Sequence, residues 1–170
     1  MEQRTLIIST LENIDKKVVI KGWVSTVRNH GKLVFLDVRD RTGVIQCVGT
    51  VNEKVNPESS VEISGKVVKR PEKLINPDIE TGTVELQIED YKILSSSVEL
   101  PFDMGKKDLD LSLPILLDHR PLTLKNSKQQ AIFKVQQAVS DSFREASKEL
   151  NCTEIFVPTI SASSTEGGSE

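Results

Sequence analysis

The chain has 170 residues, a formal charge of −3, and 28% charged against 37% hydrophobic residues, which is typical of a globular protein and excludes a disordered one. No apolar run approaches the roughly 18 residues of a membrane span, and the first residues lack the order of a signal peptide, so we expect a cytoplasmic protein with no membrane association. Cys47 and Cys152 have no CxxC partner or histidine companion, which argues against a zinc site and favours buried free thiols.

The first 100 residues have the alternating apolar pattern of β-strands. Turn signals separate five such runs: residues 18–28, 32–38, 44–48, 61–67 and 84–93. In the last run the apolar parity shifts to Tyr91 and Ile93, which indicates a β-bulge. Five short, sharply coiled strands favour a closed barrel, of which the oligonucleotide/oligosaccharide-binding (OB) fold is the commonest nucleic-acid-binding example.

The first two runs carry a strong excess of positive charge. Between Lys16 and Arg41 the basic residues are Lys16, Lys17, Lys21, Arg28, Lys32, Arg39 and Arg41, against only Asp37 and Asp40, which leaves about +5 on an acidic chain. This pattern predicts a face that binds a polyanion. Arg39 and Arg41 flank Asp40 in a turn, where we expect local ion pairing in preference to RNA contact.

The second run also places an aromatic residue on its outer face. Val34, Leu36 and Val38 share one side of this strand and form the better core, which leaves Phe35 on the other side. An exposed aromatic beside Arg28 suits stacking on an unpaired base. The alternative is that Phe35 packs under a loop.

The last third of the chain changes character. Residues 95–114 have little periodicity and contain three prolines or glycines that suit a connector. Apolar residues then recur with helical spacing from Ile132 to Leu150, with Ser127 and Gln130 as a capping box at the start and Asn151 as the C-terminal cap. Thr153 to Val157 reads as a short strand. We therefore expect a barrel at 1–100, a linker at 101–125 and a second, α/β domain that begins at 126–170.

Two stretches resemble one family. GWVSTVRNHGKLVFLDVRDRTGVIQ is similar to the anticodon-binding OB domain of aspartyl-tRNA synthetases, and LLDHRPLTLKNSKQQAIFKVQQAVSDSFREASKELNCTEIFVPTI resembles the start of their class II catalytic domain. The tail STEGGSE resembles their loop that closes over the amino acid. Because both stretches occur in the family's order, the resemblance covers almost the whole chain.

The resemblance implies a set of tRNA contacts. Phe35 would stack on the central anticodon base and Gln46 would hydrogen-bond its edge, since an amide offers a donor and an acceptor together. Further anticodon-loop contacts would come from Arg28 and Arg70, which suit phosphate or stacking, and from Asn76 and Glu85, which suit base edges. Taken without the family, Gln46 is equally a solvated strand residue and Glu85 a partner for a nearby lysine.

In the second half, the resemblance places Pro158 at a homodimer interface and Glu166 at the ammonium group of bound aspartate. The alternative for the long helix is packing within its own domain alone. The partners implied are tRNA-Asp, and possibly tRNA-Asn, with aspartate, ATP and Mg²⁺ in the complete enzyme. The chain has no Gly-rich phosphate loop, no carboxylate pair at metal spacing and no catalytic residue of its own, so we expect an amino-terminal piece that is inactive alone.

Two other functions remain open from the sequence. An asparagine- or lysine-specific relative would share the OB domain and the class II core. A non-catalytic OB module that binds tRNA or single-stranded nucleic acid would explain residues 1–100 equally well, but it gives no reason for the long helix, the strand and the TEGGSE tail.

Overall fold

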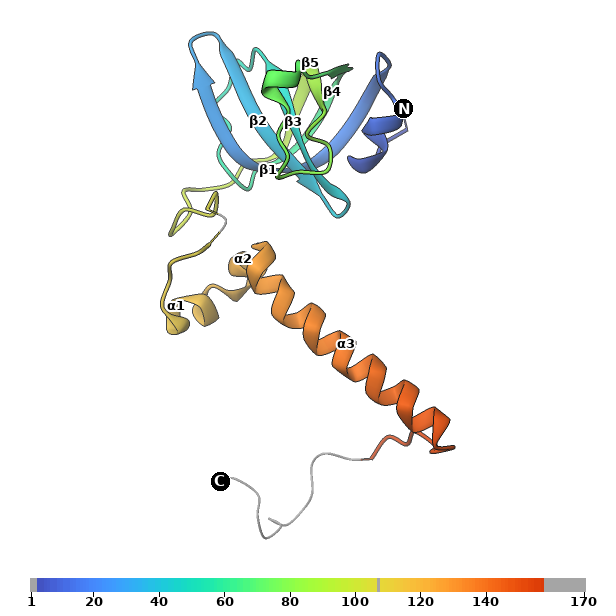
Figure 1. Ribbon diagram of the computed structural model, residues 1–170. Coiled ribbons are helices and arrows are strands. Elements are labelled where there is room, and N and C mark those ends of the chain that lie inside the picture. Colours follow the sequence, from blue (N-terminus) through green and yellow to red (C-terminus); the bar gives the residue numbers. More distant parts are fainter. Residues whose placement is uncertain (1–2, 107, 158–170) are drawn as a thin grey trace. The chain divides into compact units, whose positions relative to one another are not determined.

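The computed structural model describes residues 3–106 and 108–157, which belong to two compact units that divide between Leu111 and Ser112. The first unit is a five-stranded barrel (Figure 1) whose strands are β1 (Lys17–His30), β2 (Leu33–Asp40), β3 (Gly43–Gly49), β4 (Ser60–Lys69) and β5 (Val84–Ser95). Around the barrel the order is β1-β2-β3-β5-β4, and β4 pairs with β1 to close it. The predicted OB-fold barrel is confirmed.

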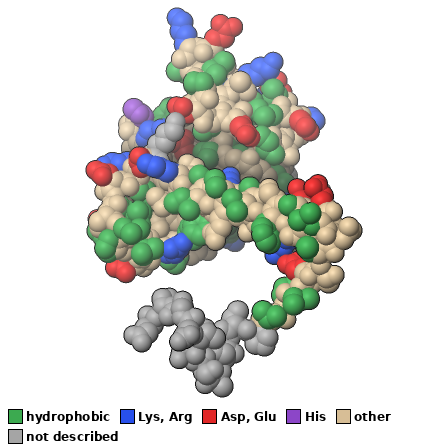
Figure 2. Space-filling model, turned by 60° about the horizontal axis from the view of Figure 1, so that its bottom comes forward, with side chains coloured by type: hydrophobic (Ala, Val, Ile, Leu, Met, Phe, Trp, Pro, Cys, Tyr) green, Lys and Arg blue, Asp and Glu red, His purple; other side chains and the backbone are tan. Residues whose placement is uncertain are grey.

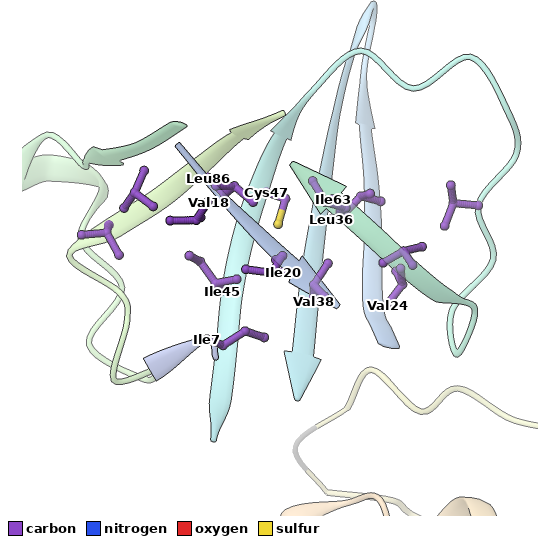
Figure 3. Close-up of a cluster of buried hydrophobic side chains, with 14 residues drawn as sticks. Ile7, Val18, Ile20, Val24, Leu36, Val38, Ile45, Cys47, Ile63 and Leu86 are labelled. Atoms are coloured by element: carbon purple, nitrogen blue, oxygen red, sulfur yellow. The ribbon is translucent and has the colours of Figure 1, made fainter. Parts of the chain in front are cut away.

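Alternating apolar residues of the five strands fill the barrel (Figure 3). Leu36 and Val38 of β2 are buried, as the strand parity predicted, and Val34 packs against the same cluster. Ile7 is also fully buried; it precedes the short 3₁₀ helix η1 (Ile8–Glu12). The inward-facing positions of the strands therefore form one apolar core inside the barrel.

Three irregularities in the strand pairing bend the strands of the barrel. The register of β5 against β4 slips at Glu89, since Ser64 faces Asp90 while Gly65 faces Ile88, so the bulge predicted from the parity shift is confirmed. At Gly65 a Cβ atom would lie 2.0 Å from the carbonyl oxygen of Gln87, so only glycine allows this close approach. The sequence did not predict the other two: Ser25 is the extra residue between Val24 and Thr26 of β1, and Leu94 is the extra residue between Ile93 and Ser95 of β5.

The second unit is helical in its described part. Two short helices, α1 (Leu113–Asp118) and α2 (Arg120–Thr123), occur where the sequence predicted an irregular connector, and α3 (Ser127–Glu149) follows. The N-cap of α3 is Asn126, whose side-chain oxygen accepts from the backbone N–H of Lys128 at 3.0 Å, so the prediction of Ser127 as the cap was wrong. The C-cap of α3 is Leu150, one residue before the predicted Asn151, which follows it in the left-handed conformation with a φ of 58°.

The predicted strand at 153–157 is not formed. A strand needs a neighbour for its backbone hydrogen bonds, and among the described residues of this unit there is none. The apolar face of α3 is exposed as well: the exposed fraction is 64% for Val135, 65% for Val139 and 74% for Phe143, and Figure 2 shows hydrophobic side chains at the surface. The described residues thus do not pack this face within its own unit. In the part of the chain that the structure describes, no helix is both long and apolar enough to cross a membrane.

Candidate nucleic-acid interface

The outer face of β1, β2 and β3 carries three of the six side chains predicted to contact RNA, namely Arg28, Phe35 and Gln46. Arg28 on β1 faces Phe35 on β2, and two residues further along β2 Asp37 faces Gln46 on β3. Directly paired residues point to the same side of a sheet, and Leu36 between them points into the core. These four side chains therefore lie together on the outside of the barrel.

Phe35 lies outside the core cluster and is partly exposed, as the strand parity predicted. Its ring meets His30 edge to face, with the ring centroids 5.4 Å apart and the planes at 85°. This contact leaves the ring neither inside the barrel nor fully in solvent. An aromatic ring in this position can stack on a flat, unpaired base.

Gln46 is the centre of a polar network and not the solvated strand residue that the sequence also allowed, since only 9% of it is exposed. Its Oε1 accepts from Nη2 of Arg28 at 3.3 Å and also from Nη2 of Arg70. Its Nε2 donates to Oε2 of Glu85 at 3.5 Å. The two arginines therefore hold the amide oxygen, and the amide nitrogen is turned toward a carboxylate.

Glu85 pairs with an arginine and not with a lysine, the alternative raised by the sequence. Nε of Arg70 lies 3.4 Å from Oε2 of Glu85, and the two side chains are only 6% and 18% exposed. Such shielded, charge-assisted bonds are stronger than surface pairs. The pair therefore restricts Arg70 and keeps its guanidinium beside Gln46.

Asp37 is a member of this network that sequence reasoning treated only as an offsetting charge. Its Oδ1 accepts from Nη2 of Arg28 at 2.9 Å. Burial raises the pKa of Asp37 above its ordinary value, and the charges of Arg28 and Arg70 oppose this rise without cancelling it. The signal was available, because Asp37 is two residues from Phe35 on the same face of β2.

Asn76 stands apart from the network. It lies in the loop between β4 and β5, where its backbone N–H donates to the carbonyl of Gly82 at 3.2 Å and its Oδ1 accepts from the backbone N–H of Asp78 at 3.0 Å. This Asx-type turn engages the side-chain oxygen within the loop itself. The structure thus brings together Arg28, Phe35, Gln46, Arg70 and Glu85, and leaves Asn76 in the adjoining loop.

The excess of about +5 predicted for residues 16–41 overstates the charge of this face. Four of its cations have acidic partners: Lys17 with Glu89, Lys21 with Glu62, Arg28 with Asp37, and Arg39 with Glu58. Three of these acids come from beyond residue 41, where a count over the segment could not include them. The net positive charge of this face is therefore smaller than the count over the segment predicted.

Arg39 and Asp40, expected to pair within their turn, have separate partners. Nη2 of Arg39 lies 2.5 Å from Oε1 of Glu58, a residue of the β3–β4 loop. Asp40 instead lies 3.3 Å from Nη2 of Arg4 and accepts from the backbone N–H of Thr42 at 2.7 Å. Successive strand residues point to opposite faces, so Arg39 and Asp40 cannot meet.

The remaining predictions fall elsewhere in the chain. Pro158 and Glu166 lie outside the described residues. Cys47 is fully buried, and burial strongly raises the pKa of its thiol, but Cys152 is exposed at the end of α3, so the prediction of two buried thiols was wrong for the second. No group of three or more His, Cys, Asp or Glu residues within 3–106 and 108–157 could hold a metal ion.

Comparison with known proteins agrees with this geometry. Residues 18–94 match the tRNA anti-codon family, described as an OB-fold nucleic acid binding domain, which agrees with the barrel topology. The chain as a whole is similar to aspartate–tRNA ligases. It is 33% identical over 164 residues to the aspartate–tRNA(Asp/Asn) ligase of Streptococcus mutans, with 92% of this chain and 28% of that protein covered.

One further curated relative and one solved structure are also similar to nearly the whole of this chain. The chain is 34% identical to the aspartate–tRNA ligase of Staphylococcus epidermidis over 93% of its own length and 28% of that protein. Among solved structures, the asparaginyl-tRNA synthetase of Pyrococcus horikoshii complexed with asparaginyl-adenylate is 29% identical, with a TM-score of 0.76 over 99% of this chain and 39% of that one. The chain thus spans little more than a quarter of the length of the curated relatives that it matches.

Proposed function

We propose that the outer face of the barrel binds the anticodon of a tRNA, and that this chain is the tRNA-recognition part of an aspartate–tRNA ligase. One observation carries the proposal: a partly exposed ring, Phe35, lies beside an amide, Gln46, whose orientation two arginines restrict. Stacking on an aromatic ring supplies affinity for any base, and a restrained amide adds selectivity for one.

The orientation of Gln46 defines what it can read. The side-chain oxygen of Gln46 accepts from Arg28 and Arg70, and its amide nitrogen donates one hydrogen to Glu85. The second hydrogen of the amide nitrogen can therefore be donated to the base. A carbonyl oxygen on the base edge, such as that of uracil, is the matching acceptor. Arg28 has an exposed side chain and can also meet a phosphate, at the expense of its bond to Asp37.

For the complete enzyme we infer the ligation of aspartate to tRNA-Asp with ATP and Mg²⁺, in a homodimer. In this scheme Glu166 meets the ammonium group of aspartate and Pro158 lies at the dimer interface. No residue of this chain is assigned to ATP or Mg²⁺. The S. mutans relative is named for both tRNA-Asp and tRNA-Asn, so tRNA-Asn is a second candidate substrate.

An asparagine-specific enzyme is the alternative that an observation favours, because the P. horikoshii asparaginyl-tRNA synthetase matches nearly the whole chain. The two readings share an anticodon-binding barrel and differ in the amino acid that is activated. Binding of tRNA by this chain tests the shared part.

The test is a titration of the full chain with anticodon stem-loops that differ at the central base, at one stated salt concentration, since phosphate contacts depend on salt. Phe35→Ala should weaken binding to all of them by about 1–3 kcal/mol if the ring stacks. Gln46→Ala should mainly reduce discrimination at the central base. Leu94→Ala, an exposed apolar residue of β5, is the matched control. Binding of both site variants with the affinity of the parent would refute the assignment.

A further inference from the structure

A second exposed aromatic residue lies on the same outer face as Phe35. Trp23 on β1 pairs with Arg39 on β2, and Arg39 is four residues from Phe35, on the same side of that strand. In β1 the bulge at Ser25 shifts the parity, so that Trp23 and Arg28 point to the same side although five residues separate them. The bulge thus extends the face that carries Phe35 and Gln46 as far as Trp23.

The side chain of Trp23 is well exposed, with an exposed fraction of 45%. The guanidinium carbon of Arg39 lies 5.8 Å from the centroid of its ring. Arg39 is itself held in place, because its Nη2 donates to both carboxylate oxygens of Glu58, at 2.5 and 2.6 Å. The side chains of Arg39 and Glu58 are only 21% and 6% exposed, so the group that contacts the ring is restrained.

The backbone at Glu58 is unfavourable for a residue with a side chain, since its φ is +68°. Such strain persists only where the surroundings impose it, and it often marks a functional position. Here the backbone bonds from Glu58 N–H to the Val24 carbonyl (2.6 Å) and from Val24 N–H to the Ser59 carbonyl (2.9 Å) impose it.

A purely structural role explains only part of this arrangement. The Arg39–Glu58 pair and the two backbone bonds already attach the β3–β4 loop to β1. They do not require an indole ring, and they do not explain why nearly half of Trp23 remains exposed beside a fixed cation. An exposed ring next to an arginine is the combination that binds an unpaired base together with its phosphate.

We propose that Trp23 and Arg39 form a second nucleotide subsite, which takes an unpaired base of the same RNA that binds at Phe35 and Gln46. Four residues along β2 separate the two subsites, about 13 Å at the rise of a strand, a span that a few nucleotides of single-stranded RNA bridge. The ring of Trp23 supplies the stacking surface, and Arg39, whose charge is paired with Glu58, holds that ring in position. This inference rests on the proposed function, because the occupant is a loop of the same tRNA.

The chain's single tryptophan makes the proposal directly measurable. Titration of the full chain with an anticodon stem-loop should quench the fluorescence of Trp23 and shield it from acrylamide. Trp23→Ala should raise the dissociation constant roughly 5- to 150-fold, the range that follows from one lost stacking contact. Trp23→Phe should retain most of the affinity, and Leu94→Ala should retain all of it.

The outcomes separate this proposal from the one that it rests on. If the stem-loop binds and Phe35→Ala weakens it, but the emission of Trp23 does not change at saturation, the second subsite is refuted and the anticodon assignment stands. If the stem-loop does not bind the parent chain, both fail. The fluorescence of the parent decides even where Trp23→Ala does not fold. Equal affinities of Trp23→Ala and the parent would also refute the subsite.

Discussion

Two neighbouring residues of β2, Phe35 and Leu36, should have opposite roles, although both are large and apolar. Leu36 is 1% exposed and belongs to the core, whereas Phe35 is partly exposed on the outer face. Substitution of each by alanine therefore tests the facing of the strand on which the proposed site depends. Leu36→Ala should destabilise the fold, and Phe35→Ala should impair RNA binding with little effect on folding.

The magnitudes follow from what each side chain contacts. Leu36→Ala leaves a cavity in a closed barrel whose walls are tied by backbone hydrogen bonds and cannot easily collapse, so we expect a loss of about 2–5 kcal/mol in the free energy of unfolding. Phe35→Ala removes only an edge-to-face contact with His30 at the surface, so we expect the free energy of unfolding to fall by about 1 kcal/mol or less.

Urea unfolding of the full chain, followed by circular dichroism of the β-signal, measures both changes, and a stem-loop titration of the same samples measures binding. Leu33→Ala is the matched control for stability, because Leu33 lies on the same strand and is 46% exposed. If Phe35→Ala lowers the unfolding free energy as much as Leu36→Ala does, Phe35 is a core residue, and the assignment of the outer face is wrong.

Three further predictions concern the cap of α3, the thiols and one carboxylate. Asn126→Ala should destabilise α3 by about 1 kcal/mol, whereas Ser127→Ala should not. Circular dichroism at 222 nm, which measures helix content, should decrease for the first variant only. A thiol reagent should label only Cys152 in the native chain and also Cys47 in urea; rapid native labelling of both would contradict the burial of Cys47. Burial alone would raise the pKa of Asp40, but hydrogen bonds to it lower the pKa below its ordinary value. The stabilisation of the fold by ionised Asp40 is therefore complete above the ordinary carboxyl pKa and is lost as the pH falls through the lowered pKa. Asp40→Asn should reduce the free energy of unfolding at neutral pH and match the parent in acid. An equal difference between variant and parent at both pH values would refute this.

The barrel could be predicted from the sequence because a strand with one buried face reveals itself locally. Alternation along each run identified the core residues Leu36 and Val38, and a parity shift located the bulge at Glu89. The β1 bulge at Ser25 was not predicted, although the apolar parity shifts there as well: Val24 is buried, and Val27, three residues on, packs against the core. That bulge nevertheless decides that Trp23 shares a face with Phe35.

The polar network was only partly predictable. The resemblance supplied Arg28, Gln46, Arg70 and Glu85 as separate contacts, but nothing in the sequence indicated that both arginines share the oxygen of one amide. Arg70 and Gln46 are 24 residues apart, and the closure of the barrel brings them together. The same applies to the charge, since the acids that pair with Lys17, Lys21 and Arg39 lie on β5, on β4 and in the β3–β4 loop.

The sequence by itself determined the fold class, the core of the strands, the position of α3 and the outward facing of Phe35, because each depends on periodicity within a single element. Only the tertiary structure decided which charges are neutralised, how Gln46 is oriented, and that Trp23 extends the same face, because each depends on residues far apart in the chain. The reason is physical: a hydrophobic repeat of two or 3.6 residues can be read within a single element of the sequence, whereas ion pairs and shared hydrogen bonds between distant residues form only when the barrel closes.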